Sequence, residues 1–215
     1  MTIAPLLNLY NSSFSETGGA PPREQIQRAL VLVGSERVQV GPGEIAFEKA
    51  DMAVTLDGIA KGYIVDRAVE VLRRRGAERV LVNAGGDMAS AGEALGGDAW
   101  RIGLQDPRVP DGNLGVVQLQ GESVATSGDY VQYLTPDMSL HHIIDPRTGS
   151  SPGHTSGVSV VAPSAMAADA LSTAALVLGP RDGMELLDRL EGIEGMIVTK
   201  DQAVLGSRGL GQYTA

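Results

Sequence analysis

Hydrophobic side chains recur at helical spacing in several parts of the chain, most clearly in residues 62–75. The apolar positions of this segment fall about one turn apart on one face: Ile64, Val65, Ala68, Val69 and Leu72. Three arginines end the segment and a glycine follows it, which is typical of a helix C-terminus. Residues 164–178 predict a second long helix of small and apolar residues, with a serine N-cap and Gly-Pro after its end. We expect shorter helices over residues 21–34 and 183–190.

Short segments that alternate between apolar and polar residues predict strands. They cover residues 37–40, 44–48, 53–56, 79–82, 100–104, 116–119, 142–144, 158–161, 195–200 and 203–205. Their order mixes hairpin-like runs of strands with separated helices. We therefore expect an α+β fold with mixed or antiparallel sheets and packed helices, in a single domain, rather than a doubly wound parallel sheet.

Composition narrows the classes of partner and of chemistry. The chain has 215 residues, with 17 Lys or Arg against 26 Asp or Glu, so its formal net charge is −9. Nucleic acids and anionic membranes require a basic surface, so neither is expected as the main partner. The absence of Cys excludes disulfides, thiol nucleophiles and cysteine-ligated metals. No apolar run approaches the length of about 20 residues that spans a membrane, and the N-terminal residues lack the basic region of a signal peptide. The compartment is not fixed by these features.

Several of the 28 glycines fall in three segments predicted to be turns: LDGIAKGY at 56–63, NAGGD at 83–87 and ATSGD at 125–129. In the first, Gly58 and Gly62 would let a ligand approach exposed N–H groups at the start of a helix, where anions are favoured. Each turn alone is more often structural, but three in one chain favour a phosphate-bearing ligand. None matches the dinucleotide-binding glycine motif or the phosphate loop of NTPases.

Asp169 and Thr173 are four residues apart in the predicted helix 164–178, so their side chains lie on one face. A carboxylate and a hydroxyl are hard oxygen ligands suited to Mg²⁺ that carries a substrate phosphate. The alternative is a polar stripe exposed to solvent on a surface helix. The pattern alone favours this alternative, because no second carboxylate accompanies Asp169.

The segment HHIIDPRTG at residues 141–149 combines histidine chemistry with a turn. Asp145, followed by proline and then by a glycine, predicts a tight turn. We expect His142 on a strand just before it, as a general acid or base or as a contact to a phosphate or flavin edge. A histidine that only hydrogen-bonds to the turn is an equally good interpretation. The spacing fits no zinc site.

Five segments resemble, in order and spacing, the motifs of one enzyme family: LDGIAKGYIVD, LVNAGGDMASAG, ATSGDY, HHIIDPRTG and ADALSTAALVLG. Over most of its length the chain is similar to the ApbE family of FAD:protein FMN transferases. The resemblance implies an ApbE-like fold and a Mg²⁺-dependent enzyme that binds FAD. Such an enzyme moves FMN onto a threonine hydroxyl of a target flavoprotein and releases AMP.

The resemblance also implies roles for individual residues. Asp169 and Thr173 match the family's side-chain metal ligands, and the third ligand, a backbone carbonyl, falls at Ala60 with Gly58 as the alternative. The residues expected to bind FAD are Gly58, Lys61, Gly85, Gly86, Asp87, Thr126, Ser127 and Gly128. For the lysine of this set, a solvated side chain is an equally good interpretation.

His142 takes the place of the family histidine that is linked to flavin transfer. Either His142 or Asp145 would receive the proton of the acceptor hydroxyl. If water replaces threonine as the acceptor, the same site would be a Mg²⁺-dependent FAD pyrophosphatase that yields FMN and AMP. A third hypothesis is an FAD-binding module without turnover.

Family members have a further N-terminal region, in many cases with a secretion or lipoprotein signal. We therefore expect one ApbE-like domain over residues 1–215 that is incomplete at its N-terminus. The resemblance suggests a periplasmic or other extracytoplasmic, membrane-associated location, with any anchor in the missing region. We also consider a homodimer.

Overall fold

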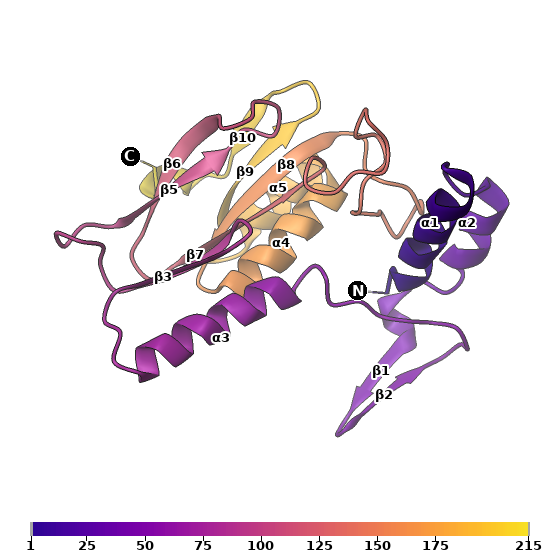
Figure 1. Cartoon of the computed structure of the whole chain (residues 1–215), viewed down its shortest axis with the longest axis horizontal. Helices are drawn as coiled ribbons and strands as arrows, with labels where there is room; N and C mark the ends of the chain where they lie inside the picture. Colours follow the sequence, from indigo (N-terminus) through magenta and orange to yellow (C-terminus); the bar gives the residue numbers. More distant parts are fainter. Residues whose placement is uncertain (1, 215) are drawn as a thin grey trace. The chain divides into compact units, whose positions relative to one another are not determined.

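The computed structural model describes residues 2–214 (Figure 1). The chain divides into two compact units, each with its own buried apolar cluster. The first unit comprises Met1–Asp57 and Gln132–Pro152, and the second comprises Gly58–Val131 and Gly153–Ala215. The expectation that residues 1–215 act as one ApbE-like domain stays a prediction.

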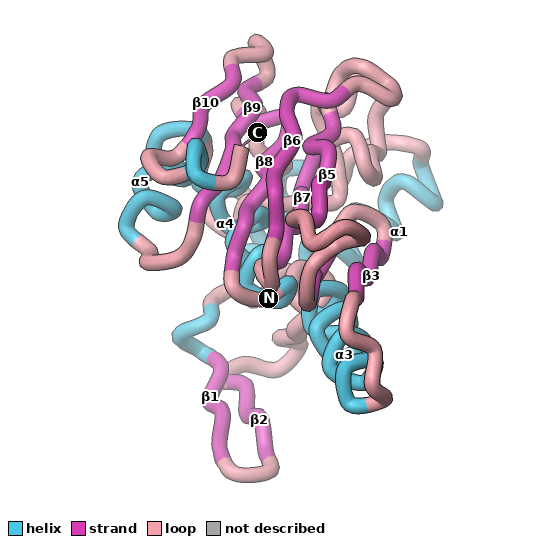
Figure 2. Tube along the Cα trace, turned by 90° about the vertical axis from the view of Figure 1, so that its left-hand side faces the viewer, coloured by secondary structure: helices cyan, strands magenta, loops and turns pink. Residues whose placement is uncertain are grey.

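The second unit, whose strands are magenta in Figure 2, is built around a six-stranded sheet, and each pair of neighbouring strands in this sheet is antiparallel. In spatial order the strands are β10 (Val204–Gly206), β9 (Glu194–Thr199), β8 (Thr155–Ala162), β7 (Ser123–Gly128), β4 (Asp87–Ala91) and β3 (Val80–Ala84). Strand β8 is buried along its whole length, and its sequence TSGVSVVA contains no charged residue.

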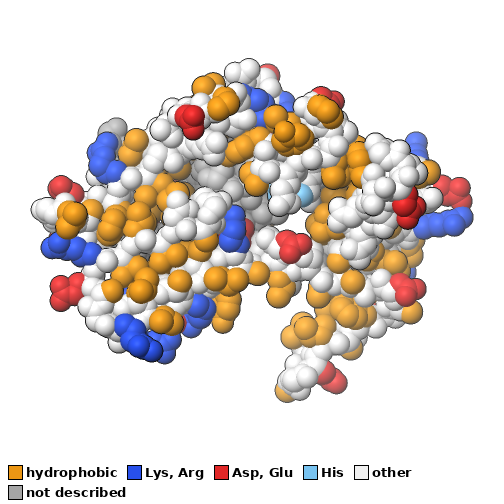
Figure 3. All heavy atoms as spheres, viewed as in Figure 1, with side chains coloured by type: hydrophobic (Ala, Val, Ile, Leu, Met, Phe, Trp, Pro, Cys, Tyr) orange, Lys and Arg blue, Asp and Glu red, His pale blue; other side chains and the backbone are white. Residues whose placement is uncertain are grey.

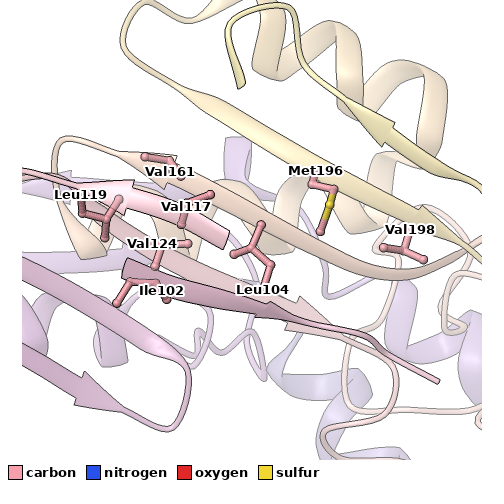
Figure 4. Packing of buried hydrophobic residues seen from close by; sticks show 8 residues of the cluster. All are labelled: Ile102, Leu104, Val117, Leu119, Val124, Val161, Met196 and Val198. Atoms are coloured by element: carbon pink, nitrogen blue, oxygen red, sulfur yellow. The ribbon is translucent and has the colours of Figure 1, made fainter. Parts of the chain in front are cut away.

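The two faces of this sheet are covered by different elements. The hairpin of β5 (Trp100–Gln105) and β6 (Asn113–Leu119) covers one face. Its inward side chains join those of the sheet in a buried cluster (Figure 4): Ile102, Leu104, Val117, Leu119, Val124, Val161, Met196 and Val198. Helices α3 (Ala60–Arg74), α4 (Ala165–Leu178) and α5 (Pro180–Arg189) pack on the other face. Since strand side chains alternate between faces, Val124 of β7 faces the hairpin and Ser127 faces α4.

Helices α3 and α4 touch at backbone distance. A Cβ on Gly62 of α3 would lie 2.2 Å from the carbonyl oxygen of Ala165, so this crossing requires glycine. Beside it, the carboxylate of Asp66 accepts hydrogen bonds from the N–H groups of Ala165 at 2.8 Å and Met166 at 3.0 Å. These N–H groups have no acceptor within their own helix, so Asp66 caps α4 and fixes the start of α4 on α3.

A buried carboxylate joins three loops of the second unit. Asp129, which follows β7, has no exposed surface and accepts hydrogen bonds from both terminal nitrogens of Arg108, at 2.8 and 2.6 Å, and from Lys200. Burial disfavours its charge, but the hydrogen bonds from Arg108 and Lys200 outweigh burial and hold the pKa of Asp129 below its usual range. Asp129 is therefore a structural anion.

The first unit contains α1 (Ala4–Thr17), α2 (Arg23–Leu30), the short 3₁₀ turn η1 (Ser35–Arg37) and the hairpin of β1 (Val38–Gly41) and β2 (Glu44–Phe47). Its buried cluster consists of Leu6, Tyr10, Val33 and Ile144. The hydroxyl of Tyr10 donates to the carbonyl oxygen of Gly149 at 3.0 Å, which ties the loop 132–152 to α1.

Exposed apolar side chains are spread over the face that Figure 3 shows, and several of the exposed residues lie on α3 and on the β1–β2 hairpin. On α3 they include Tyr63 and Ile64, and on the β1–β2 hairpin they include Val40, Ile45 and Phe47. Over residues 2–214, no helix combines the length and apolar character needed to cross a membrane. The homodimer stays a prediction.

The predicted α+β class with antiparallel sheets is confirmed. Helix α3 begins two residues before the predicted segment 62–75, and α4 matches 164–178 closely. Helix α1 is not predicted, because its asparagines and serines favour caps and turns over helix interiors. The signals that would have located it are the proline in its first turn and Gly18 at its C-cap, with φ of +71°.

Three local predictions are wrong. Residues 53–56 and 142–144 are irregular rather than strands, because an alternating pattern forms a strand where a neighbour supplies hydrogen bonds. Around 142–144 the chain makes isolated bridges instead, between Tyr133 and His141 and between Asp145 and Ser150. The segment 125–129 is not a turn, since β7 runs through Gly128 and pairs with both β4 and β8.

Candidate functional site

In the second unit, Lys61 in the first turn of α3 reaches the turn between β3 and β4. Gly85 and Gly86 form this two-residue turn with φ angles of +61° and +100°, and Ala84 pairs with Asp87 across it. Two positive φ angles suit glycine and match the hairpin turns that fit strand twist. The Lys61 ammonium donates to the carbonyl oxygen of Gly85 at 3.4 Å and lies 3.1 Å from Asp87 Oδ1. Four residues expected to bind FAD are thus brought together.

Asp169 is held between α3 and α4. It is 5% exposed, and its Oδ2 accepts a hydrogen bond from the N–H of Gly62 at 3.0 Å. This N–H lies in the first turn of α3, where it has no acceptor within the helix and where the helix dipole favours an anion. Its burial excludes the alternative of a solvent-exposed polar stripe.

Asp87 lies next to Asp169 and is more deeply buried, with 1% of its surface exposed. Its Oδ1 faces Lys61, whereas its Oδ2 has no hydrogen-bond partner among residues 2–214. Burial and the neighbouring Asp169 carboxylate raise the pKa of Asp87 to about 6, although the Lys61 ammonium opposes this. Two neighbouring buried carboxylates and one ammonium leave a local excess of negative charge.

A chain of hydroxyls determines how Thr173 presents its oxygen. Ser172 donates to the carbonyl oxygen of Asp169 at 3.0 Å, and Ser127 lies 2.8 Å from Ser172 and 2.9 Å from Thr173. Each hydroxyl has one proton. Once Ser172 has donated its proton, Ser127 must donate to Ser172 and Thr173 must donate to Ser127. The lone pairs of Thr173 Oγ1 are then left to accept another group or to bind a cation.

The backbone that enters α3 passes close to this hydroxyl. A Cβ built on Gly58 would lie 3.6 Å from the side chain of Thr173, and Ala60 is the first residue of α3. The loop therefore brings main-chain groups to the side of α4 that carries Thr173. Which of the two residues supplies a ligand carbonyl stays a prediction.

The expected FAD-binding residues of β7 do not share one position. Thr126 points to the opposite face of the sheet and bonds to Ser159 at 2.8 Å. Gly128 lies at the end of the strand, where a Cβ would come within 2.2 Å of the ring of Tyr130. Of the three residues, Ser127 is the one whose side chain lies with Thr173. Roles of Thr126 and Gly128 in binding FAD stay predictions.

This oxygen-rich set fits a hard divalent cation. Among residues 2–214 there is no group of three or more His, Cys, Asp or Glu side chains that could hold a metal, so an all-side-chain cage is not formed. The site instead offers the Asp169 carboxylate, the Thr173 hydroxyl and the unpartnered, buried Asp87 Oδ2. Mg²⁺ is commonly bound in this way, by one or two carboxylates together with waters and substrate phosphates.

His142 and Asp145 belong to the first unit. His142 Nδ1 lies 3.0 Å from the carbonyl oxygen of Gln132. A carbonyl can only accept, so Nδ1 carries the proton and the neutral ring keeps its lone pair on Nε2. His142 therefore has the tautomer that a general base acting through Nε2 requires.

Asp145 is engaged by its own turn. Its carboxylate accepts from the backbone N–H of Arg147 at 2.8 Å and from the guanidinium of the same residue, at 2.8 Å from Nη2 to Oδ2. The predicted tight turn is confirmed by the hydrogen bond from the N–H of Gly149 to the carbonyl oxygen of Asp145, at 2.8 Å. Both oxygens of the Asp145 carboxylate are therefore engaged within the turn.

Sequence reasoning missed two contacts of the site. The ion pair between Lys61 and Asp87 joins residues 26 positions apart in the sequence. Each of them was predicted to contact FAD, but a contact between them was not predicted. Ser127 contacts Thr173 across the sheet–helix interface, because β7 is a strand and not a turn. The alternation V-A-T-S in residues 124–127 is the signal that could have shown Ser127 to share a face with Ala125.

Comparisons with known proteins agree with this arrangement. The sequence model of the ApbE family matches residues 1–197. The chain is 32% identical over 209 residues to the "FAD:protein FMN transferase" of Escherichia coli (strain K12), which covers 94% of this chain and 59% of that protein. The chain thus spans about three fifths of the length of this curated relative.

Solved structures show the same fold. The crystal structure of the ApbE protein from Thermotoga maritima is similar with a TM-score of 0.90 and 32% identity, covering all of this chain and 71% of that one. The apo form of the Pseudomonas stutzeri flavinyl transferase ApbE is similar with a TM-score of 0.83 and 30% identity, covering all of this chain and 67% of that one.

Proposed function

Because the chain belongs to the ApbE family, we propose that it transfers FMN from FAD to a threonine hydroxyl of a target flavoprotein, with Mg²⁺, and releases AMP. The observation that carries this proposal is the oxygen cluster at the start of α3. There the buried Asp169 carboxylate and the oriented Thr173 hydroxyl accompany an unsatisfied buried carboxylate.

The cation would be held by Asp169 and Thr173, with the backbone carbonyl of Ala60, or of Gly58, as a third ligand. Bound Mg²⁺ would neutralise charge on the pyrophosphate of FAD and so assist its cleavage. The protein's own contribution is to fix these oxygens. Gly62 holds the Asp169 carboxylate through its N–H, and Ser127 holds the Thr173 hydroxyl.

The phosphates would be received by backbone and ammonium groups near this cluster. The Gly85-Gly86 turn has no Cβ to obstruct a ligand, and nothing lies within 4 Å of where a Cβ would stand on either glycine. Lys61 is 43% exposed at its side chain, so its ammonium can contact an anion while it is anchored on Asp87. The solvated-lysine alternative is thereby weakened.

In the transfer, the threonine oxygen forms a bond to the phosphorus of FMN. The bond between that phosphorus and the bridging oxygen breaks, and AMP leaves with the electron pair. The hydroxyl proton must pass to a base. We assign it to Nε2 of His142, on the strength of its tautomer, and give Asp145 the role of fixing the turn that follows.

The test is to incubate the protein with FAD, MgCl₂ and a flavoprotein domain that carries an acceptor threonine. Intact-mass spectrometry measures FMN attached to the acceptor, and chromatography measures AMP. We expect an FMN adduct and an equal amount of AMP, with both lost in EDTA and the adduct lost when the acceptor threonine is alanine.

Two other outcomes separate the remaining hypotheses. AMP and FMN without an adduct would identify an FAD pyrophosphatase. FAD binding without AMP would identify a binding module. Either result would contradict the proposed transfer. The extracytoplasmic, membrane-associated location stays a prediction.

A further inference from the structure

Asp87 and Asp169 form a buried carboxylate pair with too little positive charge around it. They are 1% and 5% exposed, and neighbouring residues of α3 contact both: the Lys61 ammonium lies 3.1 Å from Asp87 Oδ1, and the N–H of Gly62 donates to Asp169 Oδ2 at 3.0 Å. Buried charges are normally paired, because an unpaired ion loses its hydration without compensation. Two carboxylates and one ammonium leave one negative charge in excess.

The partners of the individual oxygens show where the excess lies. Asp87 Oδ1 is occupied by Lys61, and Asp169 Oδ2 is occupied by the N–H of Gly62. Asp87 Oδ2 has no donor among residues 2–214 and is itself buried. When both carboxylates are ionised each of them only accepts, so a proton, a water or a cation between them is needed to satisfy this oxygen. A water could donate to both groups, but it would leave the excess charge in place.

The position of Asp87 is fixed by the fold. It is the first residue of β4 and pairs with Ala84 across the Gly85-Gly86 turn, so its backbone is held by the sheet. Lys61 bonds to the same turn and restrains the carboxylate from the other side. Such preorganisation is characteristic of groups that bind a ligand, since it reduces the ordering that binding requires.

We propose that Asp87 is a second acidic side chain of the cation site, contacting the divalent cation or one of its waters through Oδ2, while the Lys61 ammonium at Oδ1 offsets part of the negative charge. This inference rests on the proposed function, which places the cation at Asp169 and Thr173. It changes the role of Asp87 from a residue that lines the FAD site to one that holds the cation. A second carboxylate brings the site to the one or two that Mg²⁺ usually takes.

A purely structural Asp87 would behave differently on substitution. If Asp87 only anchored Lys61, Asp87→Asn would weaken the fold and leave cation affinity nearly unchanged. If Asp87 holds the cation, the asparagine amide can instead donate to Asp169. The cation-free protein then becomes as stable as the parent or more stable, while cation affinity falls.

The experiment is a titration with Mn²⁺ at pH 8 without FAD, followed by calorimetry, together with thermal unfolding in EDTA. We expect Asp87→Asn to bind Mn²⁺ at least tenfold more weakly, with an unchanged or higher melting temperature in EDTA. The matched control is Asp98→Asn, an exposed carboxylate with the same change of charge, which should stay within twofold of the parent. Affinity of Asp87→Asn within twofold of the parent would overturn the inference.

Lys61→Met provides an independent test if Asp87→Asn does not fold. Removing the ammonium should tighten Mn²⁺ binding severalfold, because it increases the negative charge around the cation. Unchanged or weaker binding would overturn the inference.

Asp169→Asn separates the two proposals. If it loses Mn²⁺ binding while Asp87→Asn keeps it, the inference alone fails, whereas binding that is the same in Asp169→Asn as in the parent contradicts the cation site itself.

Discussion

The close crossing of α3 and α4 makes Gly62→Ala a stringent test of the site's architecture. The new Cβ would lie 2.2 Å from the carbonyl oxygen of Ala165 and 2.8 Å from Cα of Met166. Ordinary contacts of this kind are about 3.3–3.6 Å, so the helices must separate by about 1 Å. Both obstructing atoms are backbone, and a rotamer change cannot relieve the clash.

The magnitude follows from three terms. Overpacking costs about 1–3 kcal/mol, and stretching the hydrogen bond from Gly62 N–H to the Asp169 carboxylate costs up to about 1.5–3 kcal/mol. Replacing glycine by alanine inside a helix stabilises the helix by about 1 kcal/mol, which offsets part of this loss. We expect a net loss of about 1.5–5 kcal/mol, which lowers the melting temperature of a domain of this size by about 3–20 °C.

The assay is thermal unfolding followed by circular dichroism, combined with the Mn²⁺ titration. The matched control is Gly115→Ala in β6, where nothing lies within 4 Å of the new Cβ. Its melting temperature should change little. A Gly62→Ala protein that melts like the parent and binds Mn²⁺ with the parent's affinity would refute the proposed contact between α3 and α4 and its role in holding Asp169.

Two further predictions concern Ser127 and Asp129. Ser127→Ala removes the acceptor that orients the Thr173 hydroxyl, so Mn²⁺ affinity should fall about threefold to tenfold with little loss of stability. The control is Thr126→Ala, on the other face of β7, which should leave the Mn²⁺ affinity unchanged. Asp129→Asn leaves two cations without their buried partner and should cost about 3–5 kcal/mol in urea unfolding. Because the pKa of Asp129 is lower in the folded protein, its stabilisation is complete above the unfolded value of about 4 and is lost as pH falls below it. A parent and an Asp129→Asn variant that lose stability in parallel on acidification would contradict this role.

The sequence predicts a helix well where the capping residues and the spacing of side chains on one face are set by residues close together in the chain. Helix α4 is bounded by Ser164, whose side chain accepts from the N–H of Ala167, and by Gly179. Its spacing places Asp169 and Thr173 on one face, as predicted. The burial of Asp169 could not be predicted, because it depends on the crossing with α3, about 100 residues away in the chain.

Turn and strand predictions failed where pairing decides the outcome. Residues 125–129 contain hydroxyls and a glycine that suggest a turn, yet β8 pairs with residues 125–128 and makes them part of strand β7. Residues 53–56 alternate like a strand but are irregular. The ion pair between Asp87 and Lys61 could not be predicted from the sequence either, because it forms only when the β3–β4 hairpin lies beside α3.

Release of AMP from FAD, together with the FMN adduct on the acceptor, tests the central claim most directly. AMP is measured by chromatography, and the FMN adduct by intact-mass spectrometry, after incubation of the protein with FAD, MgCl₂ and the acceptor flavoprotein, for the parent and for Asp169→Asn, whose folding is checked by circular dichroism. We expect AMP and an equal amount of adduct from the parent with Mg²⁺, and neither above background in EDTA or from Asp169→Asn. AMP without an adduct from the parent, or AMP formation at the parent rate by Asp169→Asn or by the parent in EDTA, would contradict this claim.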